Sequence, residues 1–424
     1  MPGITLTCVK TDKFKTGCFS LNLISGLRQD TAASNALLPR VLRRGSTEFP
    51  DMERIAAQLD ELYGARVEPA VRKKGELHCI GLFADFADDR YIPGGGSVLE
   101  KTLSLLGNIL LSPDTRDGAF RRDYVESEKT ILIDDIRAAI NDKRGYSISR
   151  LLEEMCAGEA FGVSRLGREE QARKITPETL TEHYRRLITD SRIEAFYCGA
   201  AEPGRVEAAL HLAFRDLPSR GDTTAPVTDV VLYPATDTPR YFTESLDVTQ
   251  GKLSVGFRMG KVMAGVPDYP AIMVFNSVYG SGEISKLFMN VRERLSLCYY
   301  ASSMIDKHKG VMVVASGVDF KDYDAALSEI LAQLGHVQNG DISDLELNAA
   351  KRTVITAIKL AMDRPGGLED LYFDSVVSAA RYDPEDLCDM IEEVTLDRVV
   401  QASSEIRTDS IYFLKGEQAD GNGA

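Results

Sequence analysis

An arginine and a tyrosine near one another in the sequence are the residues best suited to bind a polar ligand. They lie in the stretch YGSGEISKLFMNVRERLSLCYY, residues 279–300. Apolar residues recur at helical spacing over 284–295, which predicts a helix with one apolar face, and 297–303 predicts a strand. Arg292 falls late on the helix and Tyr299 near the start of the strand. A guanidinium and a phenol held on two such elements can bind a peptide carbonyl or carboxylate. The alternative is a surface arginine and a tyrosine that belongs to a sheet, without a role in binding.

The same stretch resembles the C-terminal-half signature of the pitrilysin/insulinase superfamily of zinc peptidases. That signature is a glycine-rich turn, then LF…(V/I)RE, then GLxY. It is matched here by Leu287-Phe288, Val291-Arg292-Glu293 and Leu297-Cys298-Tyr299, with Ser296 in place of the usual glycine. In that superfamily the arginine and the tyrosine contact bound substrate. The resemblance therefore implies that Arg292 and Tyr299 are substrate-binding residues.

The zinc-binding half of the superfamily signature is absent from the sequence. The superfamily holds zinc with H-x-x-E-H on a helix and a later glutamate, and the glutamate of the motif activates water. No two histidines of this chain lie within one helical turn of each other, so the motif cannot be written. The histidines are His78, His183, His211, His308 and His336.

The segment that corresponds to this motif can still be recognised. It reads SNALLPRVLRRGSTEF, residues 34–49. When Arg44-Gly45-Ser46 is matched to the family's KGT, Ala36 and Arg40 fall at the two histidines and Pro39 falls at the catalytic glutamate. A methyl group, a guanidinium and a pyrrolidine cannot ligate zinc or move a proton. We therefore expect no metal, no cofactor and no catalytic residue in this chain.

The third zinc position of the superfamily falls in ESEKTILIDDI, residues 126–136. The family has two glutamates seven positions apart here, and the second binds zinc. Glu128 matches the first glutamate, and Asp135 falls at the second with a side chain shorter by one methylene. The alternative for this segment is a charged helix face. The cluster Arg40, Arg43 and Arg44 either meets acidic groups of a partner or faces solvent.

Composition sets limits on the class of protein. The chain has 424 residues, 44% of them hydrophobic and 27% charged, and a net charge of −14. These values are typical of a soluble globular protein of two domains, and they disfavour nucleic acid and anionic membranes as partners. The seven cysteines form no C-x-x-C, so we expect reduced core residues in a cytoplasmic protein. No signal peptide and no membrane-spanning run is predicted at any point.

The order of predicted elements repeats along the chain. Each half begins with two strands, which are followed by a pair of helices, a strand hairpin and several more helices. A further strand comes at or near the end of each half. This repetition predicts an α+β fold with two homologous α/β domains, an internal duplication. We place the domains at 1–217 and 239–415, a linker at 218–238 and a disordered tail at 416–424. The superfamily has the same architecture, a LuxS/metallohydrolase-like half of a hinged clamshell.

Within the superfamily the chain resembles a bacterial, Gram-positive branch that lacks the zinc motif. Ile140-Asn141-Asp142-Lys143 and Glu153-Glu154-Met155-Cys156 carry this resemblance. The family label of that branch refers to 5-aminopentanol modification of elongation factor P, and its members are encoded beside a second protein that keeps H-x-x-E-H.

Three functions compete on this basis. The resemblance favours a non-catalytic subunit of a heterodimeric zinc peptidase, in which this chain binds the peptide substrate and the partner carries H-x-x-E-H. The second is a structural or peptide-binding protein of the same fold without a peptidase role. The third is some autonomous enzyme, although the chain has no G-x-S-x-G elbow, and the glycine run at 93–97 lacks the Gly-Lys-Ser/Thr of a phosphate loop.

Overall fold

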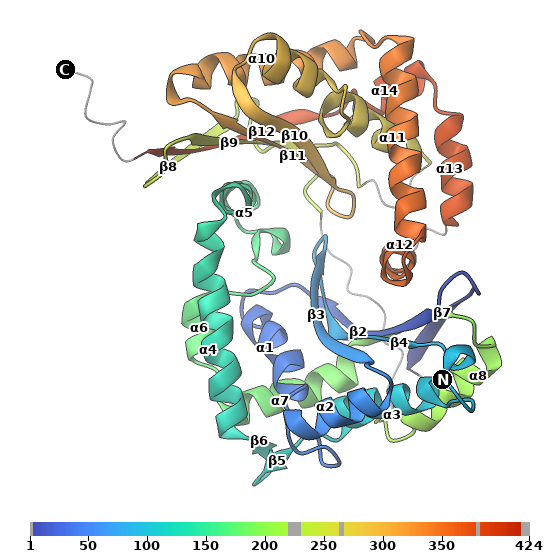
Figure 1. Ribbon diagram of the computed structural model, residues 1–424. Coiled ribbons are helices and arrows are strands. Elements are labelled where there is room, and N and C mark those ends of the chain that lie inside the picture. Colours follow the sequence, from blue (N-terminus) through green and yellow to red (C-terminus); the bar gives the residue numbers. More distant parts are fainter. Residues whose placement is uncertain (1–2, 219–229, 263–266, 379–381, 417–424) are drawn as a thin grey trace. The chain divides into compact units, whose positions relative to one another are not determined.

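The computed structural model describes residues 3–218, 230–262, 267–378 and 382–416 (Figure 1). Their contacts divide the chain into two compact units, which are described separately. Unit 1 comprises residues 1–137, 163–228 and 361–374, and unit 2 comprises residues 138–162, 229–360 and 375–424.

Unit 1 is built on a five-stranded sheet with the order β1-β7-β2-β4-β3. Only β1 and β7 pair in parallel, and the other neighbours in this sheet are antiparallel. The strands are β1 (Ile4–Lys10), β2 (Thr16–Gly26), β3 (Arg66–Lys74), β4 (Leu77–Ala87) and β7 (Arg192–Gly199).

Helices cover one face of this sheet, with α1, α2 and α3 grouped there in Figure 1. The main core of the unit lies between the sheet and these helices, because Phe19, Leu37, Leu82 and Leu103 are all fully or almost fully buried there. The helices of unit 1 are α1 (Ala32–Leu42), α2 (Met52–Glu61), α3 (Val98–Leu111), α4 (Arg122–Ala138), α6 (Glu169–Arg173), α7 (Pro177–Asp190) and α8 (Pro203–Ala213).

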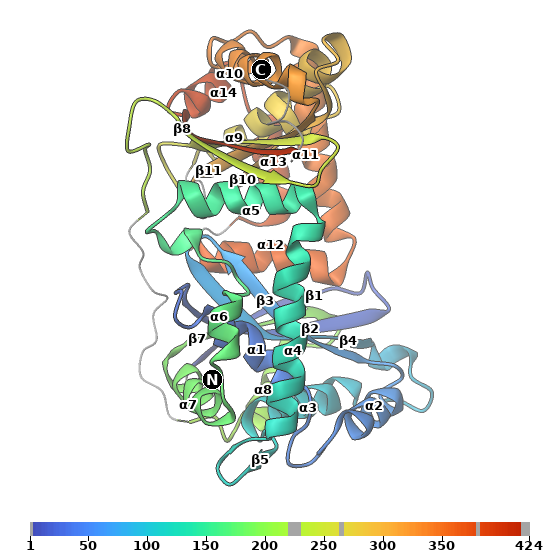
Figure 2. The ribbon, with the colours of Figure 1, turned by 90° about the vertical axis from the view of Figure 1, so that its left-hand side faces the viewer.

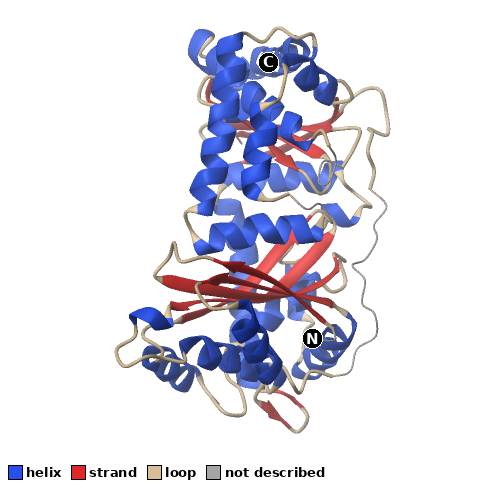
Figure 3. Ribbon diagram, turned by 90° about the vertical axis from the view of Figure 1, so that its right-hand side faces the viewer, coloured by secondary structure: helices blue, strands red, loops and turns tan. Residues whose placement is uncertain are grey.

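Unit 2 repeats this plan with a sheet of the order β10-β11-β9-β12-β8. Here β12 and β8 pair in parallel, and the other neighbours are antiparallel. Figure 3 shows each sheet as one layer of red strands with blue helices against it. The strands are β8 (Arg240–Leu246), β9 (Gly251–Arg258), β10 (Cys298–Asp306), β11 (Val311–Val318) and β12 (Arg407–Gly416).

The helices of unit 2 include two segments of π-helix, in which backbone bonds join residue i to residue i+5. One of them, η4, continues α9 directly, and the other, η5, precedes β10. The helices that the second half of the sequence contributes to unit 2 are α9 (Tyr269–Asn276), η4 (Ser277–Ser281), η5 (Leu287–Arg294), α10 (Tyr323–Gln338), α11 (Asp344–Met362), α13 (Pro384–Glu392) and α14 (Leu396–Ser403).

Each half of the sequence gives one helix to the unit formed mainly by the other half. α5 (Lys143–Met155) comes from the first half but packs on β9, β11 and β12 of unit 2, where Figure 2 shows it crossing the strands. α12 (Pro365–Val377) comes from the second half, but most of it, up to residue 374, belongs to unit 1. Both helices lie on the sheet face that the other helices leave open.

An almost completely buried carboxylate attaches α12 to the sheet of unit 1. Glu369 is 2% exposed, and it accepts two hydrogen bonds from the Arg72 guanidinium of β3, at 2.7 and 2.9 Å. The Ser20 hydroxyl of β2 donates a third bond to it at 2.7 Å. Lys74 adds ion pairs to Asp370 and Asp374 of α12 at 3.0 and 2.7 Å.

A buried arginine attaches the C-terminal end of α5 to the sheet of unit 2. Arg258 of β9 is 2% exposed and donates to the Met155 carbonyl at 3.0 Å, to Glu159 at 2.5 Å and to Asp409 at 3.0 Å. Gly256 lets the helix approach, because a Cβ there would lie 2.6 Å from Met155 Sδ. The charge of Arg258 is therefore neutralised by the two carboxylates, and its guanidinium also supplies a hydrogen-bond donor to a carbonyl at the end of α5.

The structure agrees with the predicted α+β class, and almost every predicted strand and helix is present. The helix predicted from Gly118 is wrong at its start, because β5 (Thr115–Arg116) and β6 (Ala119–Phe120) form a hairpin there and α4 begins at Arg122. A positive φ of 80° at Gly118 suits a hairpin turn. The short helix α6 was not predicted.

The division by contacts does not follow the two sequence halves, because residues 138–162 and 361–374 cross between units. The homologous domains at 1–217 and 239–415 describe a duplication of sequence, and their boundaries stay a prediction. Residues 219–229, about half of the linker predicted at 218–238, lie outside the described residues. So does the tail predicted at 416–424 except for Gly416, which ends β12. Among the described helices, none is long and apolar enough to cross a bilayer.

We expect that Glu369→Ala lowers the free energy of unfolding by about 1.5–3 kcal/mol, because the partly buried Arg72 guanidinium loses two charge-assisted hydrogen bonds and, among the described residues, keeps only Asp370, at 3.6 Å. Denaturation by urea measures this change. The matched control is Asp363→Ala, which removes the partner of Lys13 in an exposed pair and should cost about 1 kcal/mol or less. Equal losses in the two variants would contradict the anchoring role of Glu369.

The thermal stability should fall in acid partly because of two carboxylates of unit 2. Burial alone would raise the pKa of Glu159, but hydrogen bonds from Arg258 and Lys309 outweigh it, so its pKa lies below the ordinary 4.5. Burial would also raise the pKa of Asp409. Hydrogen bonds from Ser410, Arg240 and Arg258 outweigh this effect, so the pKa of Asp409 lies below the ordinary 3.8. Both groups bind protons more weakly when folded. Their stabilisation is therefore complete above the ordinary values and is lost as the pH falls below them.

The variant Asp409→Asn isolates this contribution. It should melt at a lower temperature than the natural chain near pH 7, and the difference between the two should shrink as the pH falls below about 4. Melting curves recorded by circular dichroism between neutral and acid pH give the comparison. A difference that stays constant with pH would rule out the ionised carboxylate as the cause.

Candidate functional site

The first candidate site is the junction of η5 and β10 in unit 2. The apolar face of η5 holds it in place, since Leu287 and Val291 are both fully buried. Arg292 projects away from that face, and its side chain is 44% exposed. Its guanidinium lies 4.7 Å from the centre of the Phe288 ring and 3.4 Å from the carboxylate of the adjacent Glu293. An exposed pair of this kind is weak, so the guanidinium can exchange it for a ligand.

Tyr299 is presented by an irregularity in β10. The pairing of β10 with β11 is regular from Tyr300 to Asp306 and shifts between Cys298 and Tyr300, which leaves Tyr299 as the extra residue. A β-bulge turns a side chain away from the regular alternation of a strand. Tyr299 is accordingly 65% exposed. Tyr299 is thus an exposed residue of strand β10, and its role in binding substrate stays a prediction.

The turn between Arg292 and Tyr299 explains one feature of the motif. Ser296 has a positive φ of 51°, a conformation that glycine adopts at no cost and other residues adopt rarely. The turn is closed by Leu297 N–H, which donates to the Val291 carbonyl at 3.0 Å. A glycine at this position is what the backbone favours, and the chain keeps the turn with serine.

Arg292 and Tyr299 lie on adjoining elements, and among the described residues no hydrogen bond joins their side chains. Burial raises the pKa of the Cys298 thiol above its ordinary value. The positive charge of Arg292 opposes this rise in part, so Arg292 lies near enough to Cys298 to act on it. Cys298 precedes Tyr299 directly, so the guanidinium and the phenol belong to the same region of unit 2. Both point outward, and a polar group of a peptide can accept from the guanidinium and exchange a bond with the phenol.

A third residue of this region, Arg144, could not be found from the sequence pattern. It lies in the first turn of α5 and donates to the Ser302 hydroxyl of β10 at 2.7 Å. Its guanidinium also lies 4.5 Å from the centre of the Tyr300 ring. Arg144 thereby fixes the strand that presents Tyr299. Only the exchange of α5 into unit 2 brings these residues together.

The second candidate site is the C-terminal end of α1 in unit 1, where the resemblance places the zinc positions. The structure brings two of these positions together, because Arg40 donates to the Asp135 carboxylate of α4 at 2.7 Å. Ala36 is completely buried, and Pro39 lies inside α1, which continues to Leu42. Neither can offer a ligand atom from its side chain. Arg40 and Asp135 form an ion pair whose two charges satisfy each other.

The other arginines of this cluster are also bonded within unit 1. Arg44 pairs with Glu128 at 3.3 Å, and Arg43 donates to the Val67 carbonyl of β3 at 2.5 Å. With Met52, Glu68 and Pro69 they surround a cavity of about 400 Å³. Within unit 1, acidic groups meet Arg40 and Arg44 and a backbone carbonyl meets Arg43; a contact of this cluster with acidic groups of a partner stays a prediction.

Two histidines that are distant in sequence meet through Asn35. His183 Nε2 bonds to Asn35 Oδ1 at 2.7 Å, and Asn35 Nδ2 bonds to His78 Nδ1 at 3.0 Å. Burial is the largest cause that lowers the pKa of both histidines, to about 4 in each case, so both are neutral near pH 7. This is a buried polar network of the core. Within the described ranges, no group of three or more His, Cys, Asp and Glu is placed to hold a metal ion.

The cysteines are all free thiols, and all but Cys8 are buried. Cys18 and Cys198 are opposite each other in β2 and β7, and a hydrogen bond between their thiols is the largest cause that raises the pKa of Cys18 and lowers that of Cys198. The prediction that the cysteines are mostly reduced core residues is confirmed for these buried positions.

Comparison with known proteins gives a consistent result. The family model described as the Peptidase M16 inactive domain matches residues 174–354, which include Arg292 and Tyr299. A protein of Bacillus subtilis strain 168 described as "Probable inactive metalloprotease YmfF" is 33% identical over 416 residues, which cover 98% of this chain and 96% of that protein.

Solved structures share the fold over the whole length. A conserved protein from Enterococcus faecalis V583 is 26% identical with a TM-score of 0.89, and the match covers 98% of this chain and 97% of that one. A peptidase M16 inactive domain from Pseudomonas fluorescens is 15% identical with a TM-score of 0.79, and the match covers 98% and 96% of the two chains. The chain therefore belongs to the M16 peptidase family, and within it this is a non-catalytic, peptidase-like member.

Proposed function

We propose that this chain is the substrate-binding subunit of a two-chain zinc peptidase. A partner of the same family carries H-x-x-E-H and performs the hydrolysis. This chain contributes Arg292, Tyr299 and half of the chamber that encloses the peptide. The proposal also places the pair in the cytoplasm, which the free thiols favour.

One observation carries the proposal, namely that the η5–β10 junction is built to present two polar side chains. A π-helix, a turn with a positive φ and a β-bulge follow one another within a few residues. Each departs from regular geometry at some cost, and such departures gather at functional sites. Their product is an exposed guanidinium and an exposed phenol on adjoining elements.

The need for a partner follows from the chemistry of peptide hydrolysis. The reaction requires an activated water as well as a positioned peptide. Ala36, Pro39 and Arg40 supply neither a metal ligand nor a base, while Arg292 and Tyr299 can position a carbonyl or a carboxylate. A chain that keeps the binding residues without the zinc residues is useful for hydrolysis when another chain supplies the zinc.

A mixing experiment tests the two-chain proposal. The chain alone should bind no stoichiometric zinc and cleave no peptide, whereas its mixture with an H-x-x-E-H homologue encoded beside it should form a heterodimer with peptidase activity. Metal analysis, size-exclusion chromatography and a fluorogenic peptide library give the three readouts. If the homologue alone is as active as the mixture, the chain is a structural or peptide-binding protein of the same fold instead. One equivalent of tightly held zinc on the chain alone would also defeat the proposal.

We expect that Arg292→Ala lowers peptidase activity of the mixture about tenfold to a hundredfold. The reason is that a charge-assisted bond to substrate is worth about 1.5–3 kcal/mol. Tyr299→Phe removes one hydroxyl and keeps the ring, so its effect should be smaller. Measurement of kcat/KM for each assembled variant gives the comparison.

The matched control for this pair is Arg294→Ala. Arg294 lies on the same π-helix, is 63% exposed, and pairs weakly with Glu329 at 3.6 Å. Melting temperatures of the three variants separate a loss of binding from a loss of folding. If Arg294→Ala reduces turnover as much as Arg292→Ala, the general charge of this helix matters and the substrate contact by Arg292 is wrong.

A further inference from the structure

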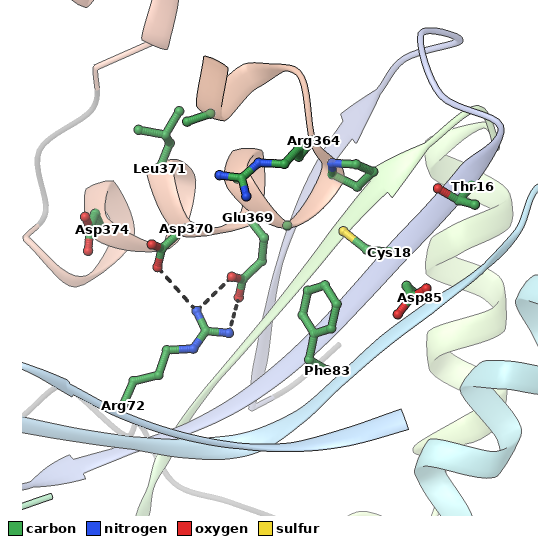
Figure 4. A pocket seen from close by; sticks show the side chains of 14 residues that line it. Thr16, Cys18, Arg72, Phe83, Asp85, Arg364, Glu369, Asp370, Leu371 and Asp374 are labelled. Carbon is green, nitrogen blue, oxygen red and sulfur yellow. Dashed lines mark hydrogen bonds and ion pairs between the residues drawn. The ribbon is translucent and has the colours of Figure 1, made fainter. Parts of the chain in front are cut away.

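A cavity of about 610 Å³ lies within unit 1, between the sheet and the first turn of α12 (Figure 4). Its lining includes Thr16 and Cys18 of β2 and Phe83 and Asp85 of β4. Residues before and at the start of α12, among them Arg364 and Gly366, line the other side. This volume is within the range of about 300–1,000 Å³ that is usual for sites of small ligands.

Most charges that line this cavity are already paired. Arg72 uses its fork on Glu369 and also lies 3.6 Å from Asp370, as the dashed lines of Figure 4 show. Asp370 and Asp374 also pair with Lys74. These side chains bind one another, so their charges are not available to a ligand.

Two lining charges of opposite sign remain without such partners. Asp85 is half-buried and Arg364 is exposed, and within the described part of the chain neither side chain has an ion pair or a hydrogen bond. Asp85 and Thr16 lie at one end of the view in Figure 4, beside Phe83 and Cys18. Between the two free charges the lining is therefore partly apolar, with an aromatic ring and a thiol.

The first turn of α12 leaves room for a ligand because Gly366 has no side chain. A Cβ built on Gly366 would lie 3.5 Å from Cζ of Phe83, which is an ordinary van der Waals distance. A longer side chain at this position would extend toward the ring and fill the space. The N-terminal end of the helix also favours negative charge, which adds to the charge of Arg364.

We propose that this cavity binds a small zwitterion of the amino-acid or short-peptide class. Asp85 and the Thr16 hydroxyl receive the ammonium group, Arg364 receives the carboxylate, and the apolar part of the ligand lies over Phe83. A carboxylate acceptor and a guanidinium donor at separate points of one cavity favour a ligand that carries both charges over one that carries either alone. This inference does not rest on the two-chain peptidase, since every residue in it belongs to unit 1.

Calorimetric titration of the full chain tests the proposal with leucine, the dipeptide Leu-Leu, N-acetyl-Leu-Leu and Leu-Leu amide. We expect saturable binding of Leu-Leu or leucine in the micromolar to millimolar range, and the one that binds more tightly identifies the source as peptide or free amino acid. Each cap removes one charge of the dipeptide and should weaken binding about tenfold or more.

Two charge-removing variants make the test specific to this cavity. Asp85→Asn should weaken Leu-Leu binding about tenfold. In this variant N-acetyl-Leu-Leu should bind no more weakly than Leu-Leu, whereas the amide cap should still weaken binding. Arg364→Gln should do the same with the roles of the two caps exchanged. Arg352→Gln on α11, another exposed arginine, should change neither. Gly366→Leu should block binding by filling the cavity, while its melting temperature reports whether the fold is kept.

Several results would overturn the proposal. One is the absence of saturable binding by leucine and by Leu-Leu at millimolar concentration. Another is equal affinity for the capped and uncapped dipeptides, because the site would then not recognise the two charges. A third is binding that Asp85→Asn and Arg364→Gln leave unchanged, which would place the ligand elsewhere on the chain.

Discussion

Two arginines, the buried Arg258 and the partly buried Arg72, hold the elements that the halves of the sequence give to each other's unit. Arg72 binds Glu369 of α12 in unit 1, and Arg258 binds the end of α5 together with Glu159 in unit 2. A buried ion pair adds little net stability when complete, but its disruption costs about 3–5 kcal/mol where one charge stays fully buried alone. Each unit therefore depends on a helix from the other half of the chain. The cavity beside α12 and the contacts of Arg144 with Ser302 and Tyr300 of β10 both depend on this exchange.

The elements could be predicted from the sequence because apolar periodicity is a local property. The exchange of helices could not, because an amphipathic helix shows which face it buries but not which sheet covers it. Arg72 and Glu369 are 297 positions apart, and nothing near either of them indicates the other. The π geometry of η5 was missed for a related reason, since a shift of the hydrogen bonds by one residue hardly alters the apolar pattern. The hairpin at Gly118 was missed because the strong helical pattern that follows was extended back through it.

The candidate sites could be predicted to the extent that a short motif carries them. Arg292 and Tyr299 were found from the stretch 279–300 alone, and their exposure agrees with a binding role that still has to be tested. Arg144, the His78–Asn35–His183 network and the pairing of Cys18 with Cys198 arise only when distant segments meet. The same applies to the cavity of unit 1, whose free charges, Asp85 and Arg364, come from different halves of the chain.

The end of α1 shows why a fold of this family can exist without histidines at its zinc positions. Nine side chains of α1 are buried, among them Ala36 and Leu37, which are completely covered. Burial of an apolar side chain is worth about 1.5–3 kcal/mol, whereas an ion pair as exposed as Arg40–Asp135 contributes about 1 kcal/mol or less. The helix is therefore held by its apolar face. The polar residues at its end affect the fold little, so an ion pair can stand where relatives have zinc ligands while the sheet and the helices of unit 1 keep their form.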